Sequence, residues 1–377
     1  MIIGVPRETA EGERRVALVP ESIHRLPGAS ILVEKGAGDS AGFADLAYAD
    51  AGASLADDAS SLYSKSDLIV KVQPPTVAEA SSMKQGAALV SFLFPLSNLE
   101  AVRKLAERGA TAFAMELMPR ISRAQSMDAL SSQSTISGYK SVLMAADVLP
   151  KLFPMMMTAA GTITPARVFV LGAGVAGLEA IATAHRLGAV VEGYDVRPAV
   201  KEQVESLGAK FVELQLEAKN AQTAGGYAGA QSEEFYRKQQ EMLAEHAKAS
   251  DVVITTALVP GKRAPILVSE EAVRGMRPGS VVVDLAAEQG GNCTLTEPGK
   301  TVVKYGVTIM GPLNLPSSIA PQASQLYSRN VTSFLATMIK DGALRPNASD
   351  DLVKGTMVVD QGRVAHEATR QAMEAKA

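Results

Sequence analysis

The chain has 377 residues, of which 47% are hydrophobic, and this length is enough for two domains with separate cores. Its formal net charge of −3 and pI near 5.9 argue against a nucleic-acid partner or binding to an anionic membrane surface. A single cysteine, Cys293, excludes an internal disulfide, fits a reducing compartment and is predicted to be a small core residue.

The N-terminal third of the chain has the pattern of an α/β domain. Short apolar runs alternate with helical patterns, and the candidate strands are 2–5, 30–34, 68–72, 88–92 and 111–114. A helix expected over 98–108 opens with a capping box from Ser97 to Glu100. This alternation predicts a parallel sheet with helices on its faces.

The next apolar stretch, 142–163, is long enough for a membrane-spanning helix. It is interrupted by two prolines and two charges: Asp147, Pro150, Lys151 and Pro154. We therefore interpret it as a buried helix and a linker. The N-terminus has no signal-peptide pattern.

A second α/β unit begins near Ser131 and contains the most informative motif. The apolar run 168–171 leads into Gly172-Ala173-Gly174-Val175-Ala176-Gly177, a G-x-G-x-x-G loop that opens a helical pattern. Gly172 permits a tight turn, Gly174 lets the backbone approach a pyrophosphate, and Gly177 lets the helix pack closely on the strand. The pyrophosphate is expected at the N–H groups of the helix start.

An acid follows this loop at the expected distance. The second apolar run, 189–194, ends at Asp195, which lies 23 residues after Gly172. Asp195 can bond the hydroxyls of an adenine ribose and would repel a 2′-phosphate, which favours NAD(H) over NADP(H). Arg197 tempers this preference because it could bind a 2′-phosphate.

The rest of the chain completes the predicted organisation. Further elements are strands at 252–255, 281–284 and 308–311, a helix at 198–207 ending at Gly208, and a helix over 322–340. We expect the tail to return to the first domain, which gives 1–130 plus 321–377 and 131–320. The predicted fold is two Rossmann-like, doubly wound parallel-sheet domains with a cofactor cleft between them.

Two polar segments are candidates for function. Residues 216–240 form a long polar interruption, either a lid or a disordered insertion, and Tyr227 flanked by glycines favours the lid. The loop 119–133 concentrates Arg, Gln, Asp and Ser where a domain cleft would fall, although it could also be a solvated linker.

The usual residues of acid–base catalysis are missing from these patterns. Surface or packing roles are predicted for the four histidines, His24, His185, His246 and His366. The sequence has no metal-ligand spacing among His, Cys and carboxylates. A dehydrogenase of alcohols or amines would need a proton-transfer group.

At these motifs the chain resembles the NAD(H)-binding component, domain I, of proton-translocating nicotinamide nucleotide transhydrogenases. The similarity covers essentially the whole chain. It includes 4–8, the loop from Arg120 to Ser131, 155–162, 172–177, 195–197, 225–227, 255–261 and 284–291.

The resemblance implies a Re/Si-specific, proton-translocating NAD(P)⁺ transhydrogenase that works within a complex. Hydride passes directly from NADH on this component to NADP⁺ on an NADP(H)-binding partner, and a membrane-spanning proton-channel component couples the transfer to proton movement. It also implies a homodimer, peripheral at the cytoplasmic face of the bacterial inner membrane. Because the chain ends at Ala377 without a membrane segment, we expect either separate polypeptides or a truncated piece.

The same resemblance implies roles for individual residues. Arg120, Gln125, Asp128 and Ser131 would hold the nicotinamide and its ribose, with Gln125 meeting the second nucleotide and Asp128 orienting the carboxamide. Ala173, Gly174 and Val175 match the pyrophosphate turn, and Asp195, Val196 and Arg197 match the adenosine end. Gly226, Gln239 and Leu258 match further nucleotide contacts, although Leu258 could equally be a core residue. Tyr227 matches the tyrosine of a mobile loop.

Alanine dehydrogenases are the near alternative. Arg15 and Lys71 match positions that hold the substrate carboxylate in those enzymes. However, Phe94 and Pro95 stand where they carry a catalytic histidine, and Glu288 stands at the place of their catalytic aspartate. These departures argue against amino-acid oxidation, and an NAD-sensing module without enzymatic activity is the remaining alternative.

Overall fold

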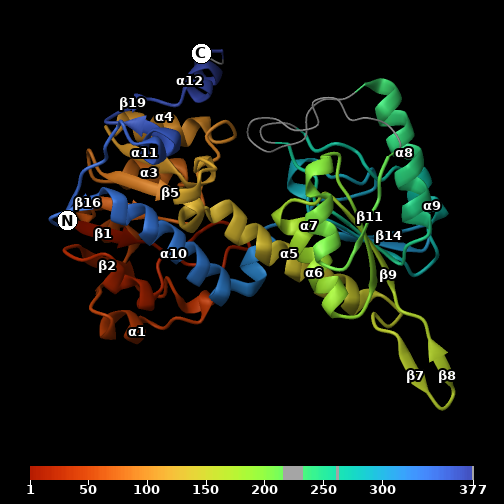
Figure 1. The fold of residues 1–377 in the computed structure, drawn as a ribbon. Helices are drawn as coiled ribbons and strands as arrows, with labels where there is room; N and C mark the ends of the chain where they lie inside the picture. The colour runs from red at the N-terminus through yellow and green to blue at the C-terminus, as the bar shows by residue number, and fades with distance from the viewer. Residues whose placement is uncertain (215–231, 260–262, 376–377) are drawn as a thin grey trace. The chain divides into compact units, whose positions relative to one another are not determined.

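The computed structural model of the protein describes residues 1–214, 232–259 and 263–375. It divides into two compact units, Met1–Gln133 with Pro316–Ala377 and Ser134–Leu315 (Figure 1). Each unit is built on a mainly parallel sheet with helices on its faces, which confirms the predicted fold class.

The sheet of the first unit has eight strands. Their order is β19 (Arg363–Val364), β18 (Met357–Asp360), β6 (Thr111–Ala114), β5 (Ala88–Ser91), β4 (Leu68–Val70), β1 (Ile2–Val5), β2 (Ser30–Glu34) and β3 (Ser54–Ala56). The strands β1 to β6 pair in parallel, and their order reverses between β1 and β4, as in a doubly wound sheet. The C-terminal segment adds β18 antiparallel to β6 and β19 antiparallel to β18.

Helices bury both faces of this sheet. They are α1 (Asp45–Asp50), α2 (Ala59–Lys65), α3 (Val77–Ser82), α4 (Leu99–Glu107), α10 (Ala320–Met338), α11 (Asp351–Thr356), α12 (Glu367–Glu374) and the start of α5 (Ala129–Val148). On β4, Leu68 and Val70 enter one core cluster with α10, while Ile69 enters a second cluster on the other face. The continuous apolar run is therefore explained by burial on both sides.

The second unit contains a seven-stranded sheet. Its order is β11 (Lys210–Phe211), β10 (Val190–Tyr194), β9 (Arg167–Leu171), β12 (Val252–Thr255), β13 (Val281–Asp284), β15 (Val307–Met310) and β14 (Thr301–Lys304). The edge strand β14, which the sequence patterns did not predict, pairs antiparallel with β15. The strand order reverses between β9 and β12, so the carboxyl ends of these two strands mark the expected ligand crevice of this unit.

Helices also flank the second sheet. α6 (Val175–Arg186) and α7 (Lys201–Ser206) share a core with one face, and α8 (Glu233–Lys248) and α9 (Glu270–Gly275) share a core with the other. The predicted interruption over 216–240 is too long, because α8 already begins at Glu233 with Ser232 as its cap. Residues 216–231 of that prediction lie outside the described residues.

The segment after α5 corrects a second expectation. Met156–Thr158 (β7) and Gly161–Ile163 (β8) form a hairpin whose residues are all exposed, which Figure 1 shows projecting from its unit. The helical part of the prediction for 142–163 is confirmed, because α5 extends to Val148 and buries Val142 and Ala145. The buried linker is wrong, because apolar composition alone does not show what covers a segment. Within the described ranges, no helix is long and apolar enough to span a bilayer.

The capping box predicted at the start of α4 is also absent. The cap is Asn98, whose amide donates to the carbonyl oxygens of Leu93 and Phe94. A capping box is formed instead at α3, where Thr76 and Glu79 bond each other's backbone N–H. At α4 the side chain of the capping residue Asn98 bonds the turn that precedes the helix rather than an N–H of the first helical turn.

Candidate functional site

The G-x-G-x-x-G loop joins β9 to α6 in the second unit. Gly172 has φ of 100°, a backbone region that favours glycine. A Cβ at Gly177 would lie 1.7 Å from the carbonyl oxygen of Gly172, whereas a Cβ at Gly174 would meet nothing within 4 Å. The predicted turn and packing roles of Gly172 and Gly177 are confirmed, and the pyrophosphate role of Gly174 stays a prediction.

Asp195 fastens this loop to the end of β10. Its Oδ2 accepts the backbone N–H of Ala173 at 2.8 Å and the Arg197 Nη2 at 2.7 Å. Its Oδ1 accepts the Arg197 backbone N–H at 2.9 Å and Nε at 2.8 Å. The hydrogen bonds with Asp195 also raise the pKa of Arg197. Asp195 therefore presents a carboxylate beside the glycine turn and at the same time neutralises Arg197.

This geometry predicts how Asp195 sets nucleotide choice. Asp195→Ala is expected to weaken NADH binding by about ten- to a hundredfold, because a charged hydrogen-bond acceptor is lost. Discrimination against NADPH should fall at least tenfold, because Arg197 is left without its carboxylate. Titration calorimetry with both nucleotides measures both effects.

A matched control for this substitution is available on the surface of the same unit. Glu213→Gln removes the exposed Lys201–Glu213 pair and should leave both affinities unchanged. Retained affinity and selectivity in Asp195→Ala would remove Asp195 from the ribose site.

The remaining candidates of the second unit differ in accessibility. Val175 and Leu258 are partly exposed at 42% and 38%, so the core interpretation of Leu258 is wrong, and Val196 is half-buried. Gln239 on α8 is buried and donates from Nε2 to the hydroxyl of Tyr194 at 2.8 Å. Gln239 therefore holds the side chain of Tyr194, the residue that precedes Asp195. Gly226 and Tyr227 lie outside the described residues.

In the first unit, the predicted nicotinamide loop forms a 3₁₀ turn, Ser122–Met127, followed by α5. Arg120 and Gln125 are exposed. Asp128 caps α5, because its Oδ1 accepts the Ser131 N–H at 2.9 Å and its Oδ2 accepts the Ser131 hydroxyl at 2.6 Å. Asp128 and Ser131 are thus brought together, and the cleft that would combine this loop with the glycine turn stays a prediction.

Asn330 on α10 holds this loop and was not among the predicted site residues. Its amide nitrogen donates to the carbonyl of Ser126 at 2.9 Å, and its oxygen accepts the hydroxyl of Ser132 at 2.7 Å. The available sequence signal was a lone asparagine on the apolar face of a helix. A buried amide needs hydrogen-bond partners, and Asn330 finds them in the Ser126 carbonyl and the Ser132 hydroxyl, in and just after the predicted nicotinamide loop.

Arg15 and Lys71 lie buried in the first unit and are bound by carboxylates. Arg15 pairs with Glu13 at 2.6 Å, and Lys71 pairs with Glu79 at 3.0 Å and Glu8 at 3.3 Å. Burial opposes ionisation of Glu13, but Arg15 outweighs it and lowers the Glu13 pKa to about 2. The ammonium of Lys71 is paired with carboxylates of the protein itself, which weakens the comparison with a site for a substrate carboxylate.

The two positions that depart from the alanine dehydrogenase pattern, Phe94 and Glu288, both take part in hydrogen bonds that hold backbone turns. The carboxylate of Glu116, after β6, accepts the backbone N–H groups of Leu93 and Phe94 at 3.0 and 2.5 Å. Phe94 itself is 43% exposed. Glu288 accepts the N–H of Asn314, which has a positive φ, as Phe94 does. Both carboxylates hold tight turns of the backbone.

The histidines and Cys293 have the predicted structural roles. His185 and His246 lie in the last turns of α6 and α8 and bond the carbonyl of Leu207 and the carboxylate of Glu192. His24 is exposed, and His366 precedes α12. Cys293 is buried, and burial raises its pKa to about 11, so it is no reactive thiolate.

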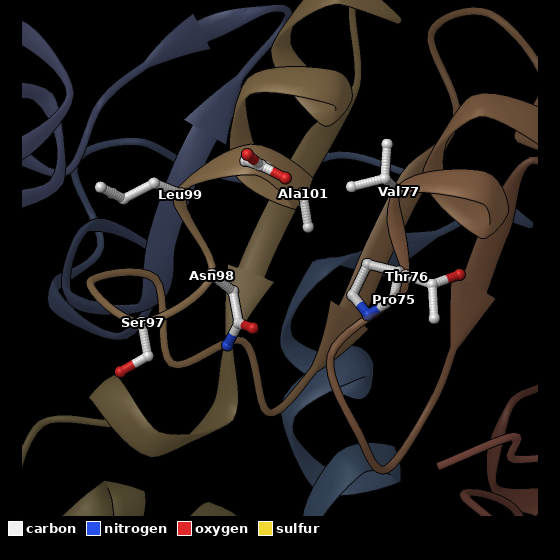
Figure 2. A pocket seen from close by; sticks show the side chains of 8 residues that line it. Pro75, Thr76, Val77, Ser97, Asn98, Leu99 and Ala101 are labelled. Atoms are coloured by element: carbon white, nitrogen blue, oxygen red, sulfur yellow. The ribbon is translucent and has the colours of Figure 1, made fainter. Parts of the chain in front are cut away.

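A cavity of about 370 Å³ opens between the first turns of α3 and α4 (Figure 2). Its lining comes from 75–77 and 97–101 and includes Thr76, Asn98 and the carboxylate of Glu100. The lining contains no basic side chain, so this cavity does not fit a pyrophosphate.

Comparison with known proteins decides the family. The model of the alanine dehydrogenase/PNT N-terminal domain matches residues 4–137, and that of the C-terminal domain matches 141–367. The chain belongs to the alanine dehydrogenase/PNT family. The resemblance identified in the sequence is therefore confirmed.

Individual relatives place the chain nearer to one branch of the family. A protein of Rhodospirillum rubrum named as the first portion of NAD(P) transhydrogenase subunit alpha is 51% identical over 98% of both chains. A transhydrogenase structure from Sinorhizobium meliloti has a TM-score of 0.86 at 44% identity, covering 98% of this chain and 100% of that one. Alanine dehydrogenase of Bacillus subtilis is 29% identical over 98% of this chain and 93% of that protein.

Proposed function

We propose that this chain is the NAD(H)-binding component of a Re/Si-specific, proton-translocating transhydrogenase. The observation that carries the proposal is the bond from the Ala173 N–H to Asp195, which joins the glycine turn to the ribose-binding position. This contact joins the carboxyl ends of β9 and β10, beside the point between β9 and β12 where the strand order reverses. It supports NAD(H) as the bound nucleotide, and the relatives named as transhydrogenase subunits support the reaction.

When NADH is bound, its dihydronicotinamide ring supplies the hydride. Arg120 and Gln125 are exposed, and Gln125 is the residue we place between the bound nucleotide and the partner. Asp128 uses its carboxylate for two bonds to Ser131, and a carboxylate has room for about two more, enough to orient a carboxamide. Direct transfer to NADP⁺ on a partner component needs no proton, which agrees with the structural roles of the histidines.

Assembly belongs to the same proposal. Met156 and Met157 in β7 are 45% and 79% exposed, and Met155, just before β7, is 59% exposed. Next to them, an apolar hollow of about 590 Å³ is lined by Ala146, residues 149–154 and Leu187. An exposed apolar surface of this kind supports docking to a second copy in a homodimer. We propose that the dimer binds the NADP(H)-binding and proton-channel components at the cytoplasmic face of the bacterial inner membrane.

The deciding experiment mixes the full chain with NADH, an NADP⁺ analogue and the NADP(H)-binding component of a related transhydrogenase. Hydride transfer that requires both proteins is the expected result. Oxidation of NADH by pyruvate and ammonia, without transfer between nucleotides, would instead assign the chain to the alanine dehydrogenases.

The same assay tests Gln125. Gln125→Asn is expected to slow transfer by about tenfold or more, because a small displacement between two reacting rings is costly. NADH affinity should change no more than a few-fold. A wild-type rate in this variant would remove Gln125 from the position between the nicotinamides.

A further inference from the structure

The segment after β12 forms one wall of the expected crevice. Thr256, Ala257 and Leu258 follow the carboxyl end of β12, next to the turn that follows β9. The Thr256 hydroxyl donates to the carbonyl of Gly172 at 3.0 Å. A Cβ at Gly172 would lie 2.5 Å from this hydroxyl, so the two segments are in close contact.

Asn292 holds this wall from behind. It is fully buried, and its Oδ1 accepts the N–H of Ala257 at 3.0 Å. Its Nδ2 donates to the carbonyl of Ala257 at 2.9 Å and to that of Pro265 at 2.7 Å. One side chain therefore binds both polar groups of Ala257, much as a neighbouring strand would.

Asn292 is itself fixed by Asp284 at the end of β13. The buried Oδ2 of Asp284 accepts the N–H groups of Asn292 and Cys293 at 2.8 and 3.0 Å and the hydroxyl of Thr296 at 2.7 Å. Its Oδ1 accepts the hydroxyl of Thr255 at 2.9 Å. Asp284 thus ties the loop that carries Asn292 to the strand that leads into the wall.

We propose that Asn292 is a positioning residue for nucleotide binding, acting through the main chain of Ala257. It keeps residues 256–258 against the Gly172 turn, so that Leu258 faces the nucleotide and the turn keeps its shape. This inference rests on the proposed NAD(H) site of the second unit. It adds a residue that touches no nucleotide but sets the geometry of those that do.

The test compares the two ends of β12. Asn292→Ala in the full chain is expected to raise the Kd for NADH on the order of tenfold. The control is Asp251→Asn at the amino end of the strand, where Asp251 accepts the N–H of Arg167 and the ammonium of Lys151. The control should lower the Tm and leave the Kd within about twofold, because its contacts lie away from the crevice.

Hydrogen exchange gives a second readout that needs no nucleotide. The Ala257 N–H should lose protection in Asn292→Ala and keep it in Asp251→Asn. If Asn292→Ala does not fold, Thr256→Val tests the second step of the inference, that contact of residues 256–258 with the Gly172 turn sets the NADH affinity. It removes the hydroxyl bond to Gly172, and a Kd increase of a few-fold is expected.

The outcomes separate this inference from the proposed function. An unchanged Kd and unchanged Ala257 protection in folded Asn292→Ala would overturn it, as would an equal loss of affinity in the control. If the unaltered chain does not bind NADH at all, the proposed function fails, and this inference fails with it even where Ala257 loses its protection.

Discussion

Two alanine substitutions three residues apart are expected to have different effects. Gly177→Ala should destabilise the fold, whereas Gly174→Ala should leave the fold stable and weaken NADH binding. At Gly177 the new methyl group would meet the Gly172 carbonyl oxygen at 1.7 Å. This oxygen belongs to the backbone and cannot rotate away, so α6 must separate from β9. We expect a loss of stability above about 3 kcal/mol or no folded protein.

At Gly174 the free protein has room for a methyl group, and the backbone at φ −78° and ψ −169° suits alanine. The loss of stability should therefore stay near or below about 1 kcal/mol, the cost of a poorer helix cap. The methyl group would, however, occupy the space a pyrophosphate needs beside the first turn of α6. We expect the Kd for NADH to rise on the order of a hundredfold.

Urea unfolding and NADH titration of both variants separate the two effects. Gly86→Ala on the surface of the first unit is a control, since its φ of 74° costs stability while the position is far in sequence from the nucleotide motifs. Tight NADH binding by Gly174→Ala would contradict the pyrophosphate position, and a stable Gly177→Ala would contradict the packing of α6 on β9.

Elements fixed by local patterns could be predicted from the sequence. The strands β1, β2, β6, β12 and β13 have the predicted boundaries, because each is a short, mainly apolar run closed by turn residues. β12 and β13 are also buried on both faces. The glycine turn and Asp195 were predictable because a fixed spacing encodes their geometry.

Features that depend on distant partners could not be predicted. The apolar residues that form the exposed β7–β8 hairpin were predicted to be a buried linker. Their composition fits both, and only the neighbouring parts of the fold decide whether they are covered. Asn292 and Asn330 act through carbonyls and N–H groups 35 and 204 residues away. A single sequence shows that a buried amide needs partners, but it does not show which backbone supplies them.

Glu116 should make the free energy of unfolding fall as pH rises from about 4.5 to about 7. Burial raises the pKa of its carboxyl from 4.5 to about 7, although the N–H groups of Leu93 and Phe94 favour the charged form. Between pH 4.5 and 7 the folded chain retains a proton that the unfolded chain has released. The unfolded state binds fewer protons, so the free energy of unfolding decreases over this window, by about 3 kcal/mol at most.

Glu116→Gln removes the titration and keeps an acceptor for the turn at Phe94. Relative to the wild type, this variant should gain about 2 to 3 kcal/mol in unfolding free energy between pH 5 and pH 8, measured by urea titration. Glu100→Gln is the control, because it removes one negative charge from an exposed position on α4 and so shows the effect of net charge alone. A constant difference between Glu116→Gln and wild type across this range would mean that the Glu116 carboxyl is already ionised at pH 5. In that case the two backbone N–H bonds, rather than burial, would control its charge, and the turn at Phe94 would be held by an anion throughout the neutral range.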